Sequence, residues 1–225
     1  MKFLFVIPAR GGSKGIPHKN IKELAGKPLI YYSIDIAKSL ADNTDICVTT
    51  DDPSIKACVE AYPLEVPFIR PDELATDQSG TYEVLLHAIT FYESKGKYYD
   101  AIVLLQPTSP FRTKAQVKEA MEQYHSSLDM VVSVKESHVP TVLCQENAEG
   151  YLELTFNKNA GRRQDMSKYY EYNGAIYVIN VASLKRESIG LFKRKHKYVM
   201  NDETSLDIDT PLDWKIAECL MSDHS

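Results

Sequence analysis

The chain has 225 residues, which at about 150 residues per domain allows one large domain or two small ones. A hydrophobic content of 44% and a charged content of 25% exclude disordered, collagen-like and coiled-coil chains. The net charge of -5 argues against a nucleic-acid-binding protein. The cysteines lie far apart, which indicates a reducing compartment, and no run of about twenty apolar residues suggests a membrane span. We therefore expect a cytoplasmic protein that binds neither nucleic acid nor membrane.

Strands and helices alternate along the first part of the chain. An apolar run that ends in a proline, such as residues 2–7, is typical of a buried parallel strand. The pattern predicts strands at residues 2–7, 45–50, 101–105 and 130–134, and helices at 28–40, 54–61, 82–94 and 115–124. This alternation predicts an α/β fold with a mostly parallel mixed sheet and helices on both faces.

The pattern becomes rich in strands further along the chain. Strands are predicted at residues 141–144, 151–156 and 175–179, with asparagine and glycine between them and no helix between the first two. We interpret residues 138–172 as a β-rich insertion within a single domain of residues 1–225. Such an insertion is expected to form a projection or a contact between subunits.

The last helix carries the clearest start signal. Thr210 is predicted as its N-cap, and a proline follows at the first helical position. Helical spacing predicts that Leu212, Ile216 and Leu220 face inward. Trp214 is expected in the core. His87, which lies among apolar residues of the helix at 82–94, is interpreted as a packed histidine rather than a base.

The loop at residues 8–20 follows the first strand and therefore lies at the carboxyl edge of the sheet, where open α/β folds bind ligands. Its three glycines let backbone amides approach a phosphate, and Ser13 adds a hydroxyl donor. Arg10 can bind a phosphate through two hydrogen bonds, while Lys14 and Lys19 supply point charges. The spacing matches neither GxxxxGK[ST] nor GxGxxG. We interpret the loop as a phosphate site; a glycine turn with solvated lysines is the alternative.

Two carboxylates stand close together near the other end of the chain. Asp207 and Asp209 alternate with apolar residues, so in an extended segment they project from the same face. Next to bound phosphates, two such oxygen ligands describe a magnesium site that keeps several waters. Taken alone, the two carboxylates are usually explained by a solvated strand end. Together with a phosphate loop, the pair predicts a site of phosphoryl transfer.

A third cluster suits a carboxylated, hydroxyl-rich ligand. Arg163 precedes several tyrosines, then Asn173 and Tyr177, although an Asn-Gly hairpin turn accounts for Asn173 as well. Gln106 and Lys135 each follow a predicted strand and are expected to share the ligand edge. The segment at residues 107–110, which begins and ends with a proline, is interpreted as a rigid turn.

Four ordered blocks, at residues 7–20, 104–112, 163–177 and 207–210, resemble the signatures of the acylneuraminate cytidylyltransferases. The resemblance extends over essentially the whole chain. It implies a Rossmann-like nucleotidyltransferase fold and the transfer of CMP from CTP to the anomeric hydroxyl of a nine-carbon 2-keto acid sugar, with release of pyrophosphate. It also implies Mg²⁺ or another divalent cation, and a homodimer whose β-rich projection reaches the neighbouring subunit.

The resemblance also implies roles for individual residues. The CTP-binding loop then comprises Arg10, Ser13, Lys19 and Asn20; the metal ligands are Asp207 and Asp209; and the acceptor-sugar contacts are Gln106, Lys135, Arg163, Asn173 and Tyr177. Arg10, Lys19 and Asp209 are expected to be catalytic, because charge that develops on the leaving pyrophosphate must be neutralised. The sugar hydroxyl can be deprotonated through metal polarisation or by Asp209, and the residues leave both routes open.

Three other functions remain as alternatives. The first is a cytidylyltransferase for the eight-carbon acid Kdo, and the second is a sugar-1-phosphate nucleotidylyltransferase. The third is a non-catalytic nucleotide-sensing module on the same fold, although such a module has no need of two metal-binding carboxylates. The sugar itself stays open among N-acetylneuraminate, its deaminated relative, legionaminate and pseudaminate, because the segment at residues 187–200 does not align with the family.

Overall fold

The computed structural model describes residues 1–13, 15–76, 80–137, 139, 143–155 and 168–223. Its strands are β1 (Phe3–Pro8), β2 (Glu23–Leu24), β3 (Lys27–Pro28), β4 (Ile46–Thr49), β5 (Ala101–Leu104), β6 (Met130–Ser137), β7 (Cys144–Glu146), β8 (Leu152–Leu154), β9 (Tyr169–Asn180) and β10 (Lys195–Val199). Its α-helices are α1 (Leu29–Leu40), α2 (Pro53–Ala61), α3 (Thr81–Ser94), α4 (Lys114–Glu122), α5 (Val181–Arg186) and α6 (Pro211–Asp223).

The central sheet has six strands in the order β10-β6-β9-β5-β1-β4. The pairs β1–β4, β1–β5 and β6–β10 are parallel, while β9 runs antiparallel to both of its neighbours, β5 and β6. The predicted α/β fold with a mostly parallel mixed sheet is therefore confirmed. Among the described residues, no helix combines the length and the hydropathy that crossing a membrane requires.

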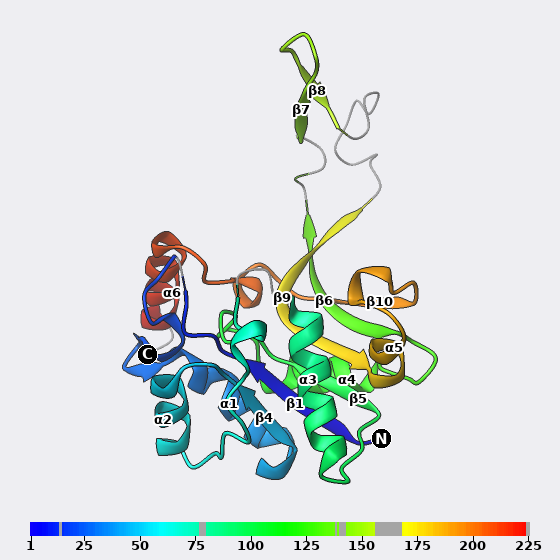
Figure 1. Cartoon of the computed structure of the whole chain (residues 1–225). Coiled ribbons are helices and arrows are strands. Elements are labelled where there is room, and N and C mark those ends of the chain that lie inside the picture. Colours follow the sequence, from blue (N-terminus) through cyan, green and yellow to red (C-terminus); the bar gives the residue numbers. More distant parts are fainter. Residues whose placement is uncertain (14, 77–79, 138, 140–142, 156–167, 224–225) are drawn as a thin grey trace.

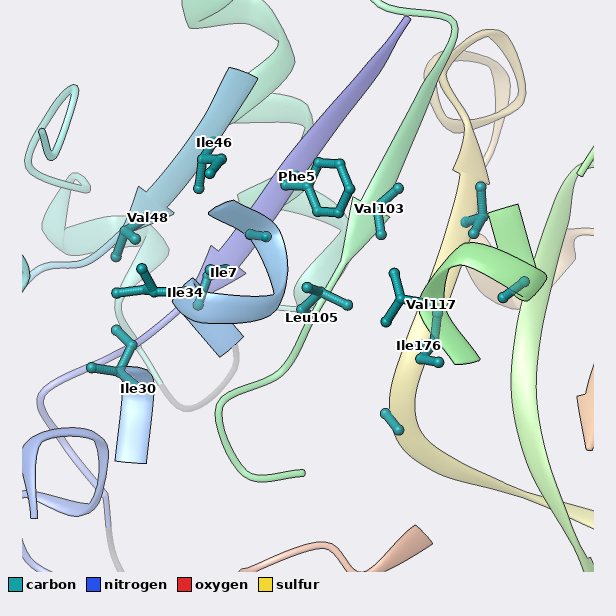
Figure 2. Packing of buried hydrophobic residues seen from close by; sticks show 14 of the residues in the cluster. Phe5, Ile7, Ile30, Ile34, Ile46, Val48, Val103, Leu105, Val117 and Ile176 are labelled. Carbon is teal, nitrogen blue, oxygen red and sulfur yellow. The ribbon is translucent and has the colours of Figure 1, made fainter. Parts of the chain in front are cut away.

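Alternate residues of each central strand pack on opposite faces of the sheet. Phe5 and Ile7 of β1 join a cluster with Ile34 of α1 (Figure 2). Leu4 and Val6 join the other cluster, which contains residues of α3 and α5. Because helices cover both faces, these strands are apolar at nearly every position, and each fully buried side chain contributes about 1.5–3 kcal/mol.

Helix α6 corrects one prediction. Its N-cap is as expected, since the Asp213 amide donates to Thr210 Oγ1 over 3.2 Å. Trp214 is buried as predicted, but the side chains of Leu212 and Ile216 are 65% and 41% exposed. The predicted inward stripe is wrong because the helix covers only a small satellite cluster and contacts it through Trp214 and Ala217.

The prediction that His87 is a packed residue is confirmed, since its ring packs edge-on against Phe68 with centroids 4.7 Å apart.

Beyond the sheet, the hairpin formed by β7 and β8 lies apart from the body of the molecule, at the far end of the extensions of β6 and β9 (Figure 1). The first two residues of a predicted strand, 141–142, and the last residue of another, 156, lie outside the described residues. The edge strand β10 was not predicted from the sequence. It pairs with β6 and contains the last three residues of a basic run at 193–197.

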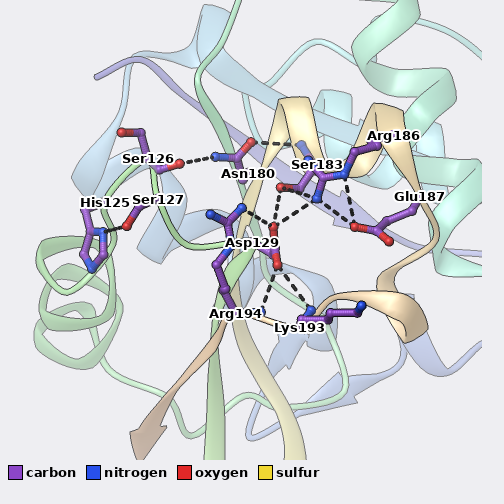
Figure 3. Close-up of polar contacts among 10 residues, drawn as sticks. All are labelled: His125, Ser126, Ser127, Asp129, Asn180, Ser183, Arg186, Glu187, Lys193 and Arg194. Atoms are coloured by element: carbon purple, nitrogen blue, oxygen red, sulfur yellow. Dashed lines mark hydrogen bonds and ion pairs between the residues drawn. The ribbon is translucent and has the colours of Figure 1, made fainter.

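The buried carboxylate of Asp129 joins α5 and the start of β10 to the start of β6 (Figure 3). It accepts hydrogen bonds from Ser183 Oγ at 2.7 Å, from Arg194 N at 2.9 Å and from Lys193 N at 3.2 Å. The guanidinium groups of Arg186 and Arg194 approach its Oδ1 to 3.2 and 3.0 Å. This group therefore fixes the far edge of the sheet.

Candidate active site

The loop after β1 packs against the residues that follow β4. The Gly11 amide donates to Asp51 Oδ1 over 3.2 Å. A Cβ atom at Gly11 would lie 2.4 Å from Asp52 Oδ2, so a side chain at this position requires the carboxylate to move. The small residue is therefore what lets the loop approach the carboxyl edge of the sheet.

Lys19 and Asn20 begin a 3₁₀ turn and are both buried. Although Lys19 is only 8% exposed, its ammonium has partners: it donates to the Ile208 carbonyl over 2.7 Å and pairs with Asp209 Oδ1 at 2.9 Å. Asn20 Nδ2 donates to the Arg10 carbonyl over 3.0 Å. Lys19 thus joins the loop at residues 8–20 to the acidic segment at residues 207–209, which comes from the other end of the chain.

The acidic segment lies between the glycine loop and the turn after β5. A Cβ atom at Gly15 would lie 2.2 Å from the Asp209 carbonyl, a distance that backbone atoms do not tolerate. On the other side, the Ile208 amide donates to the Thr108 carbonyl over 2.8 Å. Both carboxylates of the predicted metal pair are therefore held by backbone contacts at the ligand edge.

A cavity of about 350 Å³ opens at this edge. Six residues predicted from the sequence line it: Arg10, Ser13, Lys19, Asn20, Gln106 and Asp209. It is also lined by Arg70, Thr81 and Thr108. The cavity combines basic side chains, hydroxyl groups and a carboxylate, which suits a ligand that carries phosphates and a bound cation.

Arg70 is a cationic residue of this cavity that sequence reasoning missed. It is buried, and its guanidinium donates to the Thr49 carbonyl over 2.6 Å and to Thr49 Oγ1 over 3.2 Å. Burial lowers its pKa, the Asp51 carboxylate opposes this, and the charge of Arg10 lowers the pKa further. Two neighbouring guanidinium groups favour an anion between them. The sequence marks Arg70 only as part of an extended segment before Pro71. An isolated β-bridge between Thr50 and Ile69 places that segment beside the carboxyl end of β4.

Asp207 is the less accessible member of the acidic pair. Burial raises the pKa of its carboxyl group, and the charge of Asp209 adds to that effect, whereas a hydrogen bond from the Thr108 hydroxyl lowers the pKa. Within the described residues, its Oδ1 atom is buried without a hydrogen-bond partner. The Asp209 side chain is 70% exposed. Two neighbouring carboxylates, of which Asp209 lines the cavity, fit a divalent cation, because Mg²⁺ often binds one or two carboxylates together with phosphates and waters.

The described residues contain no group of three or more His, Cys, Asp or Glu side chains that could hold a metal ion. A cation bound here therefore requires further ligands from phosphate oxygens and water. This requirement is met when a nucleotide occupies the cavity, because Mg²⁺ dehydrates reluctantly and takes substrate phosphates as ligands. The residues present thus fit a cation that binds together with a nucleotide.

Three other predicted sugar contacts, Lys135, Asn173 and Tyr177, do not line this cavity. The ends of β6 and β9 that extend beyond the sheet form an arm together with the hairpin of β7 and β8. Lys135 pairs with Glu171 at 3.0 Å and lines a separate cavity of about 420 Å³ at the base of this arm. The buried Asn173 amide is used within the protein, since it accepts from Ser133 Oγ over 2.6 Å and donates to Ser205 Oγ over 2.8 Å. Tyr177 lies in β9, where burial raises the pKa of its hydroxyl to about 12.

Two predicted residues are not placed. Lys14, to which the sequence assigns no firm role, and Arg163 both lie outside the described residues. The roles of Lys135, Asn173, Tyr177 and Arg163 toward a sugar therefore stay predictions.

Comparison with known proteins gives consistent matches. The family described as Cytidylyltransferase matches residues 4–213. The N-acylneuraminate cytidylyltransferase of Streptococcus agalactiae serotype V is 39% identical over 215 residues, which cover 93% of this chain and 51% of that protein. The chain thus spans about half the length of this relative. The CMP-N,N'-diacetyllegionaminic acid synthase of Legionella pneumophila is 32% identical, with 98% of this chain and 97% of that protein covered.

The solved structure of CMP:2-keto-3-deoxy-manno-octonic acid synthetase complexed with CTP has a similar fold. Its TM-score is 0.74, all of both chains is covered, and the sequence identity is 19%. This likeness confirms the predicted Rossmann-like nucleotidyltransferase architecture. The family match over nearly the whole chain agrees with a cavity in which Arg10, Lys19 and Asp209 lie together. The chain belongs to the cytidylyltransferase family.

Proposed function

We propose that the chain transfers CMP from CTP to the anomeric hydroxyl of a nine-carbon 2-keto acid sugar and releases pyrophosphate. The observation that carries the proposal is the single cavity in which Arg10, Lys19 and Arg70 lie together with Asp209. The names of the relatives from Streptococcus and Legionella support a nine-carbon acid as acceptor. The need for CTP and the widely spaced cysteines support a cytoplasmic location.

In this reaction the protein binds and orients the substrates, and the nucleophile belongs to the sugar. Arg10 and Arg70 bind phosphate oxygens, and their fixed charges stabilise the negative charge that develops on the leaving pyrophosphate. Asp207 and Asp209 would hold Mg²⁺, which supplies further charge neutralisation at the phosphates. Lys19 holds the backbone of Ile208 and the carboxylate of Asp209, and so sets the distance between the phosphate loop and the acidic segment.

The test measures pyrophosphate release by the purified chain with Mg²⁺, each of the four nucleoside triphosphates and a panel of 2-keto acid sugars. The panel holds N-acetylneuraminate, its deaminated form, legionaminate, pseudaminate and Kdo. We expect release with CTP and a nine-carbon acid only. Release with Kdo alone would instead identify an eight-carbon acceptor, and CTP binding without release with any acid would favour a nucleotide-sensing module.

We also propose that residues 138–172 form an insertion through which two copies of the chain associate. Support comes from large apolar side chains that are exposed along the arm: Tyr151, Leu152 and Leu154 on the hairpin, and Tyr170 and Tyr172 on β9. The side chain of Leu152 is 75% exposed on a hairpin that lies apart from the body of the molecule (Figure 1). Exposed apolar surface of this kind marks contacts between proteins.

Light scattering tests this association. The wild-type chain is expected to have the mass of two copies, and Leu152→Asp is expected to shift it toward one copy, because a charge cannot be buried without a partner. Leu191→Asp is the matched control, since Leu191 is also exposed but lies outside the arm. A wild-type mass of one chain, or equal effects of the two substitutions, would contradict the proposal.

A further inference from the structure

Three buried polar atoms without a hydrogen-bond partner belong to residues that surround one stretch of β9. Among the described residues, four buried side-chain atoms lack a hydrogen-bond partner, and apart from His87 Nδ1 they are Ser109 Oγ, Arg112 Nε and Asp207 Oδ1. All three residues surround the same stretch of β9. A Cβ atom at Gly174 would lie 3.3 Å from Asp207 Oδ2 and 3.7 Å from Ser109 Oγ, and Arg112 Nη1 donates to the Ala175 carbonyl over 3.2 Å.

If they stayed without partners, these atoms would be costly for folding. A buried polar group without a partner destabilises the folded state by about 1–3 kcal/mol. Ser109 is completely buried, and although its backbone amide closes the turn onto Gln106, its hydroxyl takes no part in that turn. Residues 107–110 also contact the acidic segment, because the Thr108 carbonyl accepts from the Ile208 amide over 2.8 Å. Unsatisfied groups that cluster in this way call for an ordered water or a functional role.

Together the three atoms offer the donor and acceptor set that one buried water requires. The Arg112 Nε–H is a donor, Asp207 Oδ1 is an acceptor and the Ser109 hydroxyl can act as either, which meets the two to four partners that a buried water requires. Arg112 is itself held on three sides, by the Gln106 carbonyl at 2.7 Å, by the Ala175 carbonyl and by the Ser33 hydroxyl. Its Nε–H therefore has a fixed position.

We propose that Ser109 is a positioning residue for the candidate cation site: with Arg112 it binds a buried water that holds Asp207 Oδ1 in place for a divalent cation. This inference rests on the proposed function, because it assumes that Asp207 is a cation ligand. Ser109 acts through Asp207. Outer partners that orient metal ligands in this way are worth about ten- to a hundredfold in metal affinity.

The experiment measures Mn²⁺ binding by the full chain in the presence of CTP, from the electron paramagnetic resonance signal of unbound Mn²⁺. Ser109→Ala is expected to weaken Mn²⁺ binding about tenfold. Its CTP affinity in EDTA is expected to stay at the wild-type value. Its melting temperature is expected to stay within a few degrees of the wild type, because the water keeps Arg112 Nε and Asp207 Oδ1 as partners.

Ser183→Ala is the matched control. Ser183 is also buried, but its hydroxyl donates to Asp129 at the far edge of the sheet. This variant is expected to melt at a lower temperature and to bind Mn²⁺ like the wild type. Wild-type Mn²⁺ affinity in Ser109→Ala would overturn the inference and leave the proposed CMP transfer intact. If the wild-type chain with CTP binds no Mn²⁺, both the cation site and the role of Ser109 are overturned.

Discussion

Asp207→Asn is expected to lower kcat about 10²- to 10³-fold with CTP and the acceptor sugar, the magnitude typical for the loss of one group that stabilises a transition-state charge. Asparagine keeps the shape of the side chain, so the loss reports the missing negative charge. The carboxyl oxygen concerned is buried without a partner among the described residues and lies beside the accessible carboxylate of Asp209. Stability is not expected to fall, because burial already disfavours the charged form of Asp207.

Asp213→Asn provides the control, because Asp213 is a nearby carboxylate that caps α6 and is not proposed as a cation ligand. Asp213 Oδ2 accepts from the Thr210 amide over 2.7 Å, at the start of α6. Its replacement is expected to cost about 1 kcal/mol of stability through the lost cap, with kcat within a few-fold of the wild type. Steady-state pyrophosphate release over a range of Mg²⁺ concentrations distinguishes the two variants. Unchanged turnover in Asp207→Asn would remove the role assigned to Asp207.

Asp129→Asn is expected to lower the free energy of unfolding by about 3 kcal/mol at neutral pH, since it leaves guanidinium groups beside a buried site without their charge partner. Asp129 accepts from two backbone amides, one hydroxyl and two guanidinium groups (Figure 3). An asparagine amide nitrogen would face several of these donors with hydrogen atoms of its own. The variant is therefore expected to loosen α5 and β10 while the cavity at the opposite edge persists.

The pH dependence of this effect has a definite sign. The hydrogen bond from the Arg194 side chain, followed by that from its backbone amide, holds the pKa of Asp129 well below its usual range. A depressed folded-state pKa stabilises the protein above the unfolded value of about 3.9, and this contribution is lost as the pH falls below that value. Urea unfolding at pH 7 and pH 3 should therefore show a difference between wild type and Asp129→Asn that shrinks at pH 3.

The exposed Asp72, changed to asparagine, is the control for this stability series and is expected to stay within about 0.5 kcal/mol of the wild type at both pH values. If the gap between wild type and Asp129→Asn were equal at both pH values, the stabilisation would not come from the ionised carboxylate.

The sequence by itself determined the elements whose signals are local. Helix α6 begins at the predicted cap, Thr210, and the central strands appear as short apolar runs because helices cover both faces of the sheet. The phosphate loop could be predicted because it directly follows β1, and parallel strands present their carboxyl ends at one edge. Because β5 pairs with β1, Gln106 at the end of β5 reaches the cavity that the phosphate loop lines.

Only the tertiary structure decided features that depend on a distant neighbour. Strand β10 carries exposed lysines because it lies at the sheet edge, where charge discourages further pairing, and its sequence therefore resembles a solvated loop. The outward position of Leu212 follows from the small area that α6 covers. Arg70 and Ser109 gain their significance from long-range contacts with Thr49 and with the surroundings of Asp207. No residue spacing encodes such contacts, because they form only when segments far apart in the chain pack together at the carboxyl edge of the sheet.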